Sequence, residues 1–487
     1  MCARAVLFVL SNLLLIVGAA QVVPLGVAAL CEVASPMRSE EMWVFGLNIA
    51  GCLTVGLLGR VFFRPWAERV QVREGFAIVT FAWLLMTAVG MVPYWGTGVV
   101  HGVADAFFET MSGFTTTGAT IFADLRPLPP AIQFWRCMTQ WLGGMGVVVL
   151  SVALLPMLGV GGYRLLKAES PGGMAYERER PRVTDAAKEL WKLYLLLSLL
   201  LFVCLLLSGL SVFDAICHTF STMSTGGFSP HNASVGHFAN PWIHWIIILF
   251  MFLAGANFSV HGDLLRGRFV AAFANPEFRF YAILLASCGA IAALVAPPLQ
   301  GGIEPRIRHA VFQVVSIVTT TGFGTEDYDA WPEILRLLLV CLMFVGGSMG
   351  STSGGIKVAR VLIYIKSLVR ELHKLIFPHA LRPMRVGLKV VQPHIVSNIL
   401  AFGMVYVAAF VFGTAVLASF GYDLATSLSA SASALGNVGP GLGAVGPTAN
   451  WGHLPDLAKW ATAFLMLLGR LEVYSVLVLF TPWAWKR

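Results

Sequence analysis

The feature that most constrains this sequence is a pattern of apolar runs, long, then short, then long, that occurs four times. The long runs lie near residues 75–97 and 131–160, 189–210 and 241–260, 278–297 and 332–363, and 394–420 and 456–481. The short runs, each ending at a glycine motif, lie at about 104–117, 213–226, 308–321 and 425–438. A spanning helix needs about 20 apolar residues, so the long runs predict transmembrane helices and the short runs predict re-entrant segments.

Two further apolar segments, at about 4–33 and 42–63, precede the first repeat. With 57% hydrophobic and 12% charged residues, the chain carries more apolar surface than a soluble domain can hide. We therefore predict an all-α integral membrane protein with about ten spans and four re-entrant pore helices in a pseudo-fourfold arrangement. The expected division is 1–68 for two extra N-terminal transmembrane helices, then repeats at 69–165, 166–268, 269–375 and 376–487.

The net charge of +8 is distributed as in a membrane protein with both termini in the cytoplasm. Basic residues gather in alternate loops, at 64–73, 164–192, 266–279 and 357–389, and in the tail at 486–487. The intervening loops hold few: Arg38, Arg126, Arg306 and Arg308. This pattern accounts for the basic balance and argues against a nucleic-acid partner, leaving membrane lipid as the expected surroundings.

The four short runs share one motif when they are aligned on a glycine. The glycines are Gly118, Gly227, Gly322 and Gly439, and a serine stands six residues before each one: Ser112, Ser221, Ser316 and Ser433. Thirteen residues before the glycines stand Asp105, Asp214, His309 and Thr426, polar residues suited to the N-terminal end of a short helix. Four matches in register, each between two spanning runs, predict four equivalent loops.

The physics of such loops indicates a cation filter. Each short helix would point its partially negative C-terminal end towards the bilayer centre, and a glycine would let the chain turn back as an extended strand. Four strands around one axis form rings of carbonyl oxygens that can replace the hydration shell of a monovalent cation. The candidate cation-binding residues are Thr116, Thr117, Gly118, Thr225, Gly226, Gly227, Thr320, Thr321, Gly322, Asn437, Val438 and Gly439.

These strands resemble degenerate potassium-channel filters, and four longer segments extend the resemblance. They are FWRCMTQWLGGMGVVVLSVALLPMLG (134–159), FVGGSMGSTSGGIKVAR (344–360), ALGNVGPGLG (434–443) and LLGRLEVYSVLVLFTPWAWK (467–486). On these motifs the chain resembles the Trk/Ktr/HKT superfamily of cation transporters over essentially its whole length. The two extra N-terminal helices favour the bacterial Trk branch.

The resemblance implies potassium uptake across a bacterial inner membrane, with K⁺ as the transported ion and no other cofactor. It also implies a homodimer with one pore per subunit and a cytosolic nucleotide-binding regulatory subunit of the TrkA type. Ala119 and Pro440 stand where a potassium channel has an aromatic residue, which predicts fewer well-formed ion sites.

Two features are candidates for a gate. The run 332–363 is interrupted by the glycines Gly346, Gly347, Gly350, Gly354 and Gly355. So many glycines should break a helix, and the resemblance implies a mobile intramembrane loop below the filter; close helix packing through small residues is the alternative.

Arg470 lies within the final apolar run, where a charged side chain costs about 2.5–3.5 kcal/mol. The resemblance implies a positive charge in the pore that opposes cation passage, and the alternative is an ion pair with Glu472 or another acid. Glu109, His218 and Gln313 each stand nine residues before their glycine and either buttress the filter or satisfy nearby backbone.

Two other classes of function were weighed. A proton- or sodium-coupled symporter usually needs a titratable intramembrane site between inverted repeats, whereas these repeats enter from one side and the filter strands carry no carboxylate. A membrane enzyme would need a catalytic cluster, but the sequence has no phosphate-binding loop, nucleophile triad or metal-ligand spacing. We therefore predict a gated, channel-like permease and no enzyme.

Overall fold

The computed structural model of the chain describes residues 2–30, 38–69, 72–153, 179–298, 302–379, 383–387 and 389–485. The end of the run 131–160, most of the basic loop 164–192 and the basic tail 486–487 lie outside these residues. The described residues are mainly helical, with one antiparallel pair of short strands, β1 (Arg385–Val386) and β2 (Lys389–Val390).

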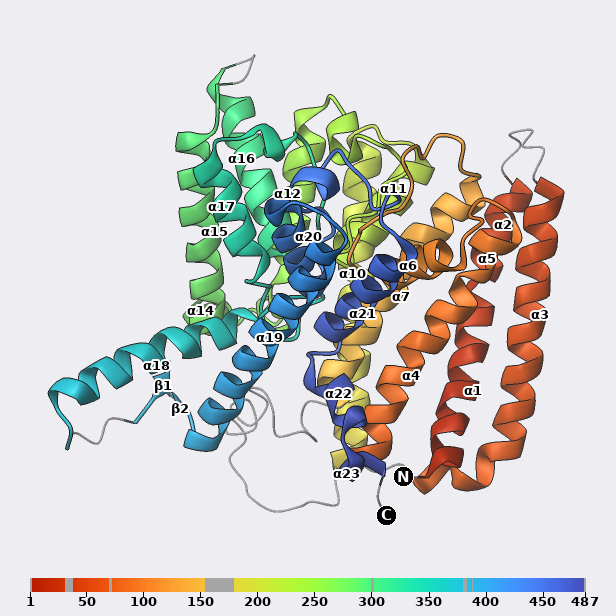
Figure 1. Cartoon of the computed structure of the whole chain (residues 1–487), viewed down its shortest axis with the longest axis horizontal. Helices are drawn as coiled ribbons and strands as arrows, with labels where there is room; N and C mark the ends of the chain where they lie inside the picture. The colour runs from red at the N-terminus through yellow and green to blue at the C-terminus, as the bar shows by residue number, and fades with distance from the viewer. Residues whose placement is uncertain are drawn as a thin grey trace.

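The predicted pair of extra N-terminal helices is confirmed. Helices α1 (Ala3–Ala20) and α2 (Val22–Leu30) form one span, and α3 (Arg38–Phe63) runs beside them before a 3₁₀ turn, η1 (Arg64–Arg69) (Figure 1). The contact is close because small residues face each other: a Cβ placed on Gly59 would lie 2.2 Å from Ser11 Oγ.

The four repeats follow in order. The first contains α4 (Val72–Gly90), α5 (Val92–Gly96), α6 (Val103–Phe114) and α7 (Pro130–Ala153). The second contains α10 (Glu179–Leu207), α11 (Val212–Met223), η2 (Ser234–His237), α12 (Pro241–Gly255) and α13 (Phe258–Leu265). The third contains α14 (Phe269–Ala274), α15 (Pro276–Val295), α16 (Ile303–Val318), η3 (Tyr328–Ala330), α17 (Glu333–Met343) and α18 (Val358–Ile376). The fourth contains α19 (Pro393–Ser419), α20 (Leu424–Gly436), η4 (Gly443–Val445), α21 (Asp456–Arg470), α22 (Tyr474–Leu477), η5 (Val478–Phe480) and α23 (Pro482–Trp485).

The four short helices α6, α11, α16 and α20 are the expected pore helices. In Figure 1 they lie in the upper half of the molecule, at the end opposite α23 and the start of α1. In the described part of the chain, six helical segments are long and apolar enough to span a membrane, and two bent helix pairs raise that number to eight. Helix α7 and the interrupted α17–α18 segment occupy the two remaining long apolar runs.

Two of the runs predicted as spans, 241–260 and 456–481, are sharply bent, which the sequence analysis did not predict. Helices α12 and α13 meet at 104°, and α21 and α22 meet at 109°. At the first bend the Asn257 side chain accepts from the Ser259 amide at 2.8 Å and so caps a new helix. At the second bend Glu472 and Val473 have φ of 55° and 57°, and an ion pair to Arg360 holds the Glu472 carboxylate.

The expected N-terminal position of His309 was also wrong. Asp105, Asp214 and Thr426 each lie in the first turn of a pore helix, but α16 begins earlier, at Ile303, and places His309 inside the helix. Pro305 in the first turn of α16 permits this start, because the first amides of a helix have no partner within it.

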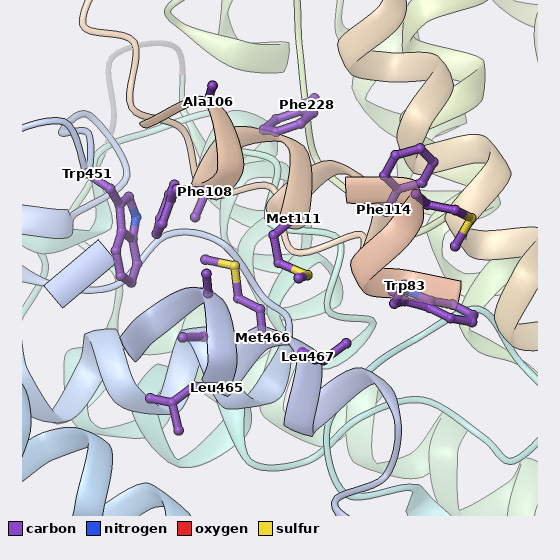
Figure 2. Close-up of a cluster of buried hydrophobic side chains, with 14 of the residues drawn as sticks. Trp83, Ala106, Phe108, Met111, Phe114, Phe228, Trp451, Leu465, Met466 and Leu467 are labelled. Atoms are coloured by element: carbon purple, nitrogen blue, oxygen red, sulfur yellow. The ribbon is translucent and has the colours of Figure 1, made fainter. Parts of the chain in front are cut away.

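A hydrophobic core fixes the first pore helix against its neighbours. Figure 2 shows Phe108, Met111 and Phe114 of α6 in one cluster with Trp83 of α4 and residues 465–467 of α21. The Phe108 ring lies 5.7 Å from the ring of Trp451. Because aromatic packing of this kind is directional, it sets the orientation of the helix as well as its depth.

Candidate ion pathway

Each pore helix is followed by a loop with the same unusual backbone. We call these segments pore loops 1 to 4 (residues 115–119, 224–228, 319–323 and 437–441). In each loop the residue two positions before the glycine has a positive φ: 52° at Thr116, 54° at Thr225, 56° at Thr320 and 55° at Asn437. Two residues later the glycines have φ of 81°, 82°, 78° and 105°. Positive φ is uncommon for residues other than glycine, so its recurrence at one aligned position gives the four loops a shared conformation.

The aligned serines hold these loops through their backbone. The carbonyl oxygens of Ser112, Ser221, Ser316 and Ser433 accept from the amides of Thr117, Gly226, Thr321 and Val438 at 2.8, 2.8, 2.8 and 2.9 Å. Each bond ties the residue before the glycine to the last turns of its own pore helix. The four loops therefore share one backbone turn.

The four loops also meet one another in a closed ring. A Cβ built on Gly118 would lie 2.2 Å from the Gly226 carbonyl oxygen, and one on Gly227 would lie 2.0 Å from that of Thr321. The ring continues at Gly322, where a Cβ would lie 2.0 Å from the Val438 carbonyl oxygen. It closes at Gly439, where a Cβ would lie 2.5 Å from the Thr117 carbonyl oxygen. No side chain fits at these positions, so glycine is required both by the positive φ and by the close carbonyl.

A cavity lies on the side of this ring that is lined by the chain following the glycines. It has a volume of about 120 Å³ and is lined by all four glycines, Gly118, Gly227, Gly322 and Gly439. Backbone groups therefore converge on one point that is accessible from one end of the molecule. In the described ranges, no group of three or more histidine, cysteine or acidic residues could hold a metal ion.

The segment between α17 and α18 is irregular, as its glycines predicted. We call residues 344–357 the intramembrane loop; helix α17 ends at Met343 and α18 begins at Val358. The helix is broken here, and the small residues of the segment also pack closely, as the alternative expected. Gly347 requires space because its Cβ would lie 2.5 Å from the Gly255 carbonyl oxygen.

The intramembrane loop lies directly against three pore loops. The Gly354 amide donates to Thr320 Oγ1 at 2.7 Å, and Thr352 Oγ1 lies 3.3 Å from Thr225 Oγ1. A Cβ on Gly354 would lie 2.8 Å from the Cβ of Asn437 in pore loop 4. These contacts place the loop at the C-terminal ends of the pore helices, beside the ring.

Arg470 is buried and reaches the same loop. Its guanidinium donates to the carbonyl oxygens of Thr352 at 2.7 Å and Gly143 at 3.3 Å. The alternative of an ion pair with Glu472 is wrong, because Glu472 pairs with Arg360 at 2.5 Å. Across the described part of the chain, the hydrogen bonds of Arg470 go to carbonyl oxygens, which leaves its positive charge without a paired carboxylate.

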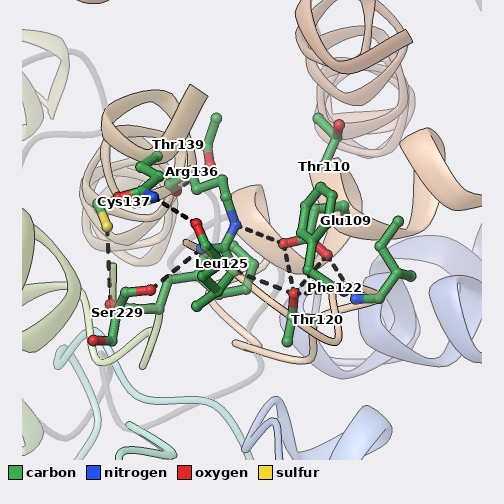
Figure 3. Close-up of polar contacts among 12 residues, drawn as sticks. Glu109, Thr110, Thr120, Phe122, Leu125, Arg136, Cys137, Thr139 and Ser229 are labelled. Atoms are coloured by element: carbon green, nitrogen blue, oxygen red, sulfur yellow. Dashed lines mark hydrogen bonds and ion pairs between the residues drawn. The ribbon is translucent and has the colours of Figure 1, made fainter. Parts of the chain in front are cut away.

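Behind pore loop 1 lies a buried ion pair. Glu109 of α6 and Arg136 of α7 are 2.8 Å apart, and their side chains are 0% and 1% exposed. Figure 3 shows the network around them: Glu109 also accepts from Thr120 and from the Ile121 amide at 2.9 Å. Arg136 donates to the Ser229 carbonyl oxygen at 3.3 Å and lies 4.3 Å from the Phe228 ring centre. The ion pair thus supports the return strands of two pore loops, Glu109 the first and Arg136 the second.

The residues aligned with Glu109 have related but weaker contacts. His218 lies 2.8 Å from the Asp214 carbonyl oxygen and 3.2 Å from Ser229 Oγ. The Gln313 amide donates to the Glu326 carbonyl oxygen at 3.1 Å. Both side chains bond to the chain that follows their pore loop. They therefore form hydrogen bonds with nearby backbone groups and also stabilise the loop.

Comparison with known proteins shows what kind of molecule has this architecture. A family model described as cation transport protein, TrkH, matches residues 44–485. The chain belongs to the TrkH family. The resemblance found in the sequence is therefore confirmed. The family consists of transporters and not of enzymes, as the sequence analysis predicted.

Relatives within the TrkH family match over most of their length. The Trk system potassium uptake protein TrkH of Salmonella typhimurium is 41% identical over 418 residues, which are 85% of this chain and 86% of that protein. TrkH of Halomonas elongata is 38% identical and covers 100% of both chains. The crystal structure of the potassium transporter TrkH from Vibrio parahaemolyticus is 34% identical, covers 100% of both chains and has a TM-score of 0.90.

The sequence interpretation assigned no role to two buried polar residues of α7, Arg136 and Gln140. Both lie in the quoted segment 134–159, and Arg136 is a charged residue inside an apolar run, as Arg470 is. The cost of burying an unpaired charge could therefore have singled out Arg136 from the sequence. Gln140 carries no comparable signal.

Proposed function

We propose that this TrkH family member takes up potassium as a gated, channel-like permease and forms the pore of a Trk system. The closed ring of four glycines and four carbonyl oxygens carries the proposal. The names of the relatives, Trk system potassium uptake proteins, support potassium as the ion. Backbone oxygens can replace the water around a monovalent cation without a fixed negative charge.

In this proposal the filter is built by the twelve aligned residues of the pore loops. They are Thr116, Thr117, Gly118, Thr225, Gly226, Gly227, Thr320, Thr321, Gly322, Asn437, Val438 and Gly439. The partially negative C-terminal ends of the pore helices point towards the ion and lower its energy near the bilayer centre. Glycine lets the loops approach closely enough for all four to contribute oxygens.

The gate is the intramembrane loop together with Arg470. The glycines Gly346, Gly347, Gly350, Gly354 and Gly355 allow the loop to change conformation, and Gly350 and Gly355 already have φ of 71° and 63°. The bond from Arg470 to Thr352 holds the loop against the pore loops and places a positive charge on the ion path. Opening requires both the loop and this charge to move away.

The cellular setting follows the same proposal. We place the protein in a bacterial inner membrane with both termini cytoplasmic, as a homodimer with one pore per subunit and a cytosolic TrkA-type regulatory subunit. The basic inner loops support an acidic or polar partner on that face. The repeats are assigned to 69–165, 166–268, 269–375 and 376–487 after the N-terminal pair at 1–68, and the boundary at 165–166 lies outside the described residues.

Rubidium-86 uptake into potassium-loaded proteoliposomes tests this proposal. We expect uptake by the wild type to be blocked by excess external K⁺ and little affected by Na⁺. We expect Gly227→Ser to abolish uptake or its selectivity, because a Cβ there would lie 2.0 Å from the Thr321 carbonyl oxygen. Uptake that ignores the substitution and requires a proton gradient would favour a coupled symporter instead.

A further inference from the structure

Pore loop 2 differs from the other pore loops immediately before its glycine. The aligned residues there are Thr117, Thr321 and Val438 in loops 1, 3 and 4, but Gly226 in loop 2. Loop 2 therefore has two consecutive glycines where the others have one. Because glycine is the most permissive residue, this strand is the one whose backbone conformation is least restricted by its own sequence.

Loops 1 and 3 restrict the same position with their own side chains. The hydroxyl oxygens of Thr115 and Thr117 lie 2.8 Å apart, and those of Thr319 and Thr321 also lie 2.8 Å apart. Gly226 has no side chain with which to make such a bond. The stabilising group for loop 2 must therefore come from another element.

That group is the side-chain amide of Gln140, on α7 of the preceding repeat. Its Nε2 donates to the Gly226 carbonyl oxygen at 2.6 Å, and its Oε1 accepts from the Phe228 amide at 3.0 Å. A backbone carbonyl can only accept and a backbone amide can only donate, so this pair of bonds has one consistent orientation of the Gln140 amide. The two bonds hold the peptide groups on both sides of Gly227.

The absence of a side chain at Gly226 is explained by the same contact. A Cβ on Gly226 would lie 2.4 Å from Gln140 Cδ and 2.5 Å from its Oε1. Gln140 is completely buried and occupies the space where a threonine or valine side chain would stand. Gly226 and Gln140 thus form one unit that spans two repeats.

We propose that Gln140 is a specificity-determining residue of the filter, which acts by fixing the position of the Gly226 carbonyl oxygen. This inference rests on the proposed potassium filter. A carbonyl oxygen has two lone pairs, so Gly226 can accept from Gln140 and still offer one to an ion. Without the amide, the Gly226–Gly227 peptide groups turn more freely, and the oxygen ring discriminates less well between K⁺ and Na⁺.

Competition for rubidium-86 uptake in proteoliposomes tests the role of Gln140. The quantity compared is the ratio of Na⁺ to K⁺ concentrations that halve uptake. Gln140→Leu removes both bonds and leaves a side chain of similar volume. We expect this variant to lower the ratio at least about fivefold, since the loss of one such bond corresponds to about 1 kcal/mol. Gln140→Glu keeps an acceptor for Phe228 but removes the donor to Gly226, and we expect it to lower the ratio as well.

Gln133→Leu is the matched control on the same helix. The Gln133 amide donates to the carbonyl oxygens of Leu125 at 2.7 Å and Leu128 at 3.2 Å, outside the pore loops. We expect this variant to keep the wild-type ratio. If Gln140→Leu keeps the wild-type ratio, the inference about Gln140 is wrong but the proposed function stands. If the leucine variant does not fold, the same result in Gln140→Glu has the same meaning. A wild type that does not prefer K⁺ would overturn the proposed function as well.

Discussion

The buried ion pair between Glu109 and Arg136 gives the most quantitative prediction for this fold. Both side chains are shielded from solvent, and each also bonds to a return strand of a pore loop. Removing one partner leaves the other as an uncompensated buried charge. Arg136→Met or Glu109→Met alone should therefore lower the free energy of unfolding by about 3–5 kcal/mol.

The double variant should cost far less than the sum of the two single variants. With both charges gone, four other hydrogen bonds are lost. Glu109 accepts from Thr120 and from the Ile121 amide, and Arg136 donates to Thr120 and to the Ser229 carbonyl oxygen. At about 1 kcal/mol each, these bonds account for about 4 kcal/mol. The expected coupling energy between the two positions is therefore at least about 2 kcal/mol.

A double-mutant cycle measured by reversible denaturation in mild detergent gives this coupling energy. The control is the pair Asp124–Arg126, which has the same 2.8 Å separation but an arginine that is 84% exposed. Solvent screens that pair, so its coupling energy should be much smaller. Additive effects at Glu109 and Arg136, within about 0.5 kcal/mol, would refute the reasoning that burial makes this pair structurally important.

Three further predictions concern the gate and the filter. Arg470→Ala should raise rubidium flux in the absence of a regulatory subunit by at least about tenfold, since the lost bond to Thr352 involves a charged donor; an unchanged basal flux would count against the gate. Glu277→Ala should also raise basal flux, because its carboxylate accepts from the Met349 amide of the intramembrane loop at 2.6 Å; Glu277→Gln, which keeps an acceptor, should change flux less, and equal effects would argue against this bond. Gly322→Ala should abolish the preference for K⁺ over Na⁺ in competition assays, because φ is 78° and the new Cβ would lie 2.0 Å from the Val438 oxygen; retained selectivity would show that the ring is wider in solution.

Much of this architecture could be predicted from the sequence because it repeats. The glycines Gly118, Gly227, Gly322 and Gly439 align with one serine each, and the structure places all four around one cavity. The short apolar runs correspond to helices α6, α11, α16 and α20, and the glycine-rich interruption corresponds to the intramembrane loop. Periodicity and glycine content are local properties, so a single sequence contains them.

The missing parts depend on contacts between distant residues. The bend after Arg470 has no glycine or proline at its centre; it is stabilised by the pair between Glu472 and Arg360, 112 residues apart. The support of pore loop 2 by Gln140 bridges 86 residues and two repeats. Neither Arg360 nor Gln140 is marked by a local pattern. The packing of α7 against α11 brings Gln140 and Gly226 together.

The most direct test of the central claim is the location of a bound ion. Crystals grown in Rb⁺ in place of K⁺ would reveal the ion by its anomalous scattering. We predict a peak on the axis of the ring, coordinated by the carbonyl oxygens of Thr117, Gly226, Thr321 and Val438. An ordered ring without such a peak at saturating Rb⁺, or a peak bound only by side chains elsewhere, would contradict a filter built from the four pore loops.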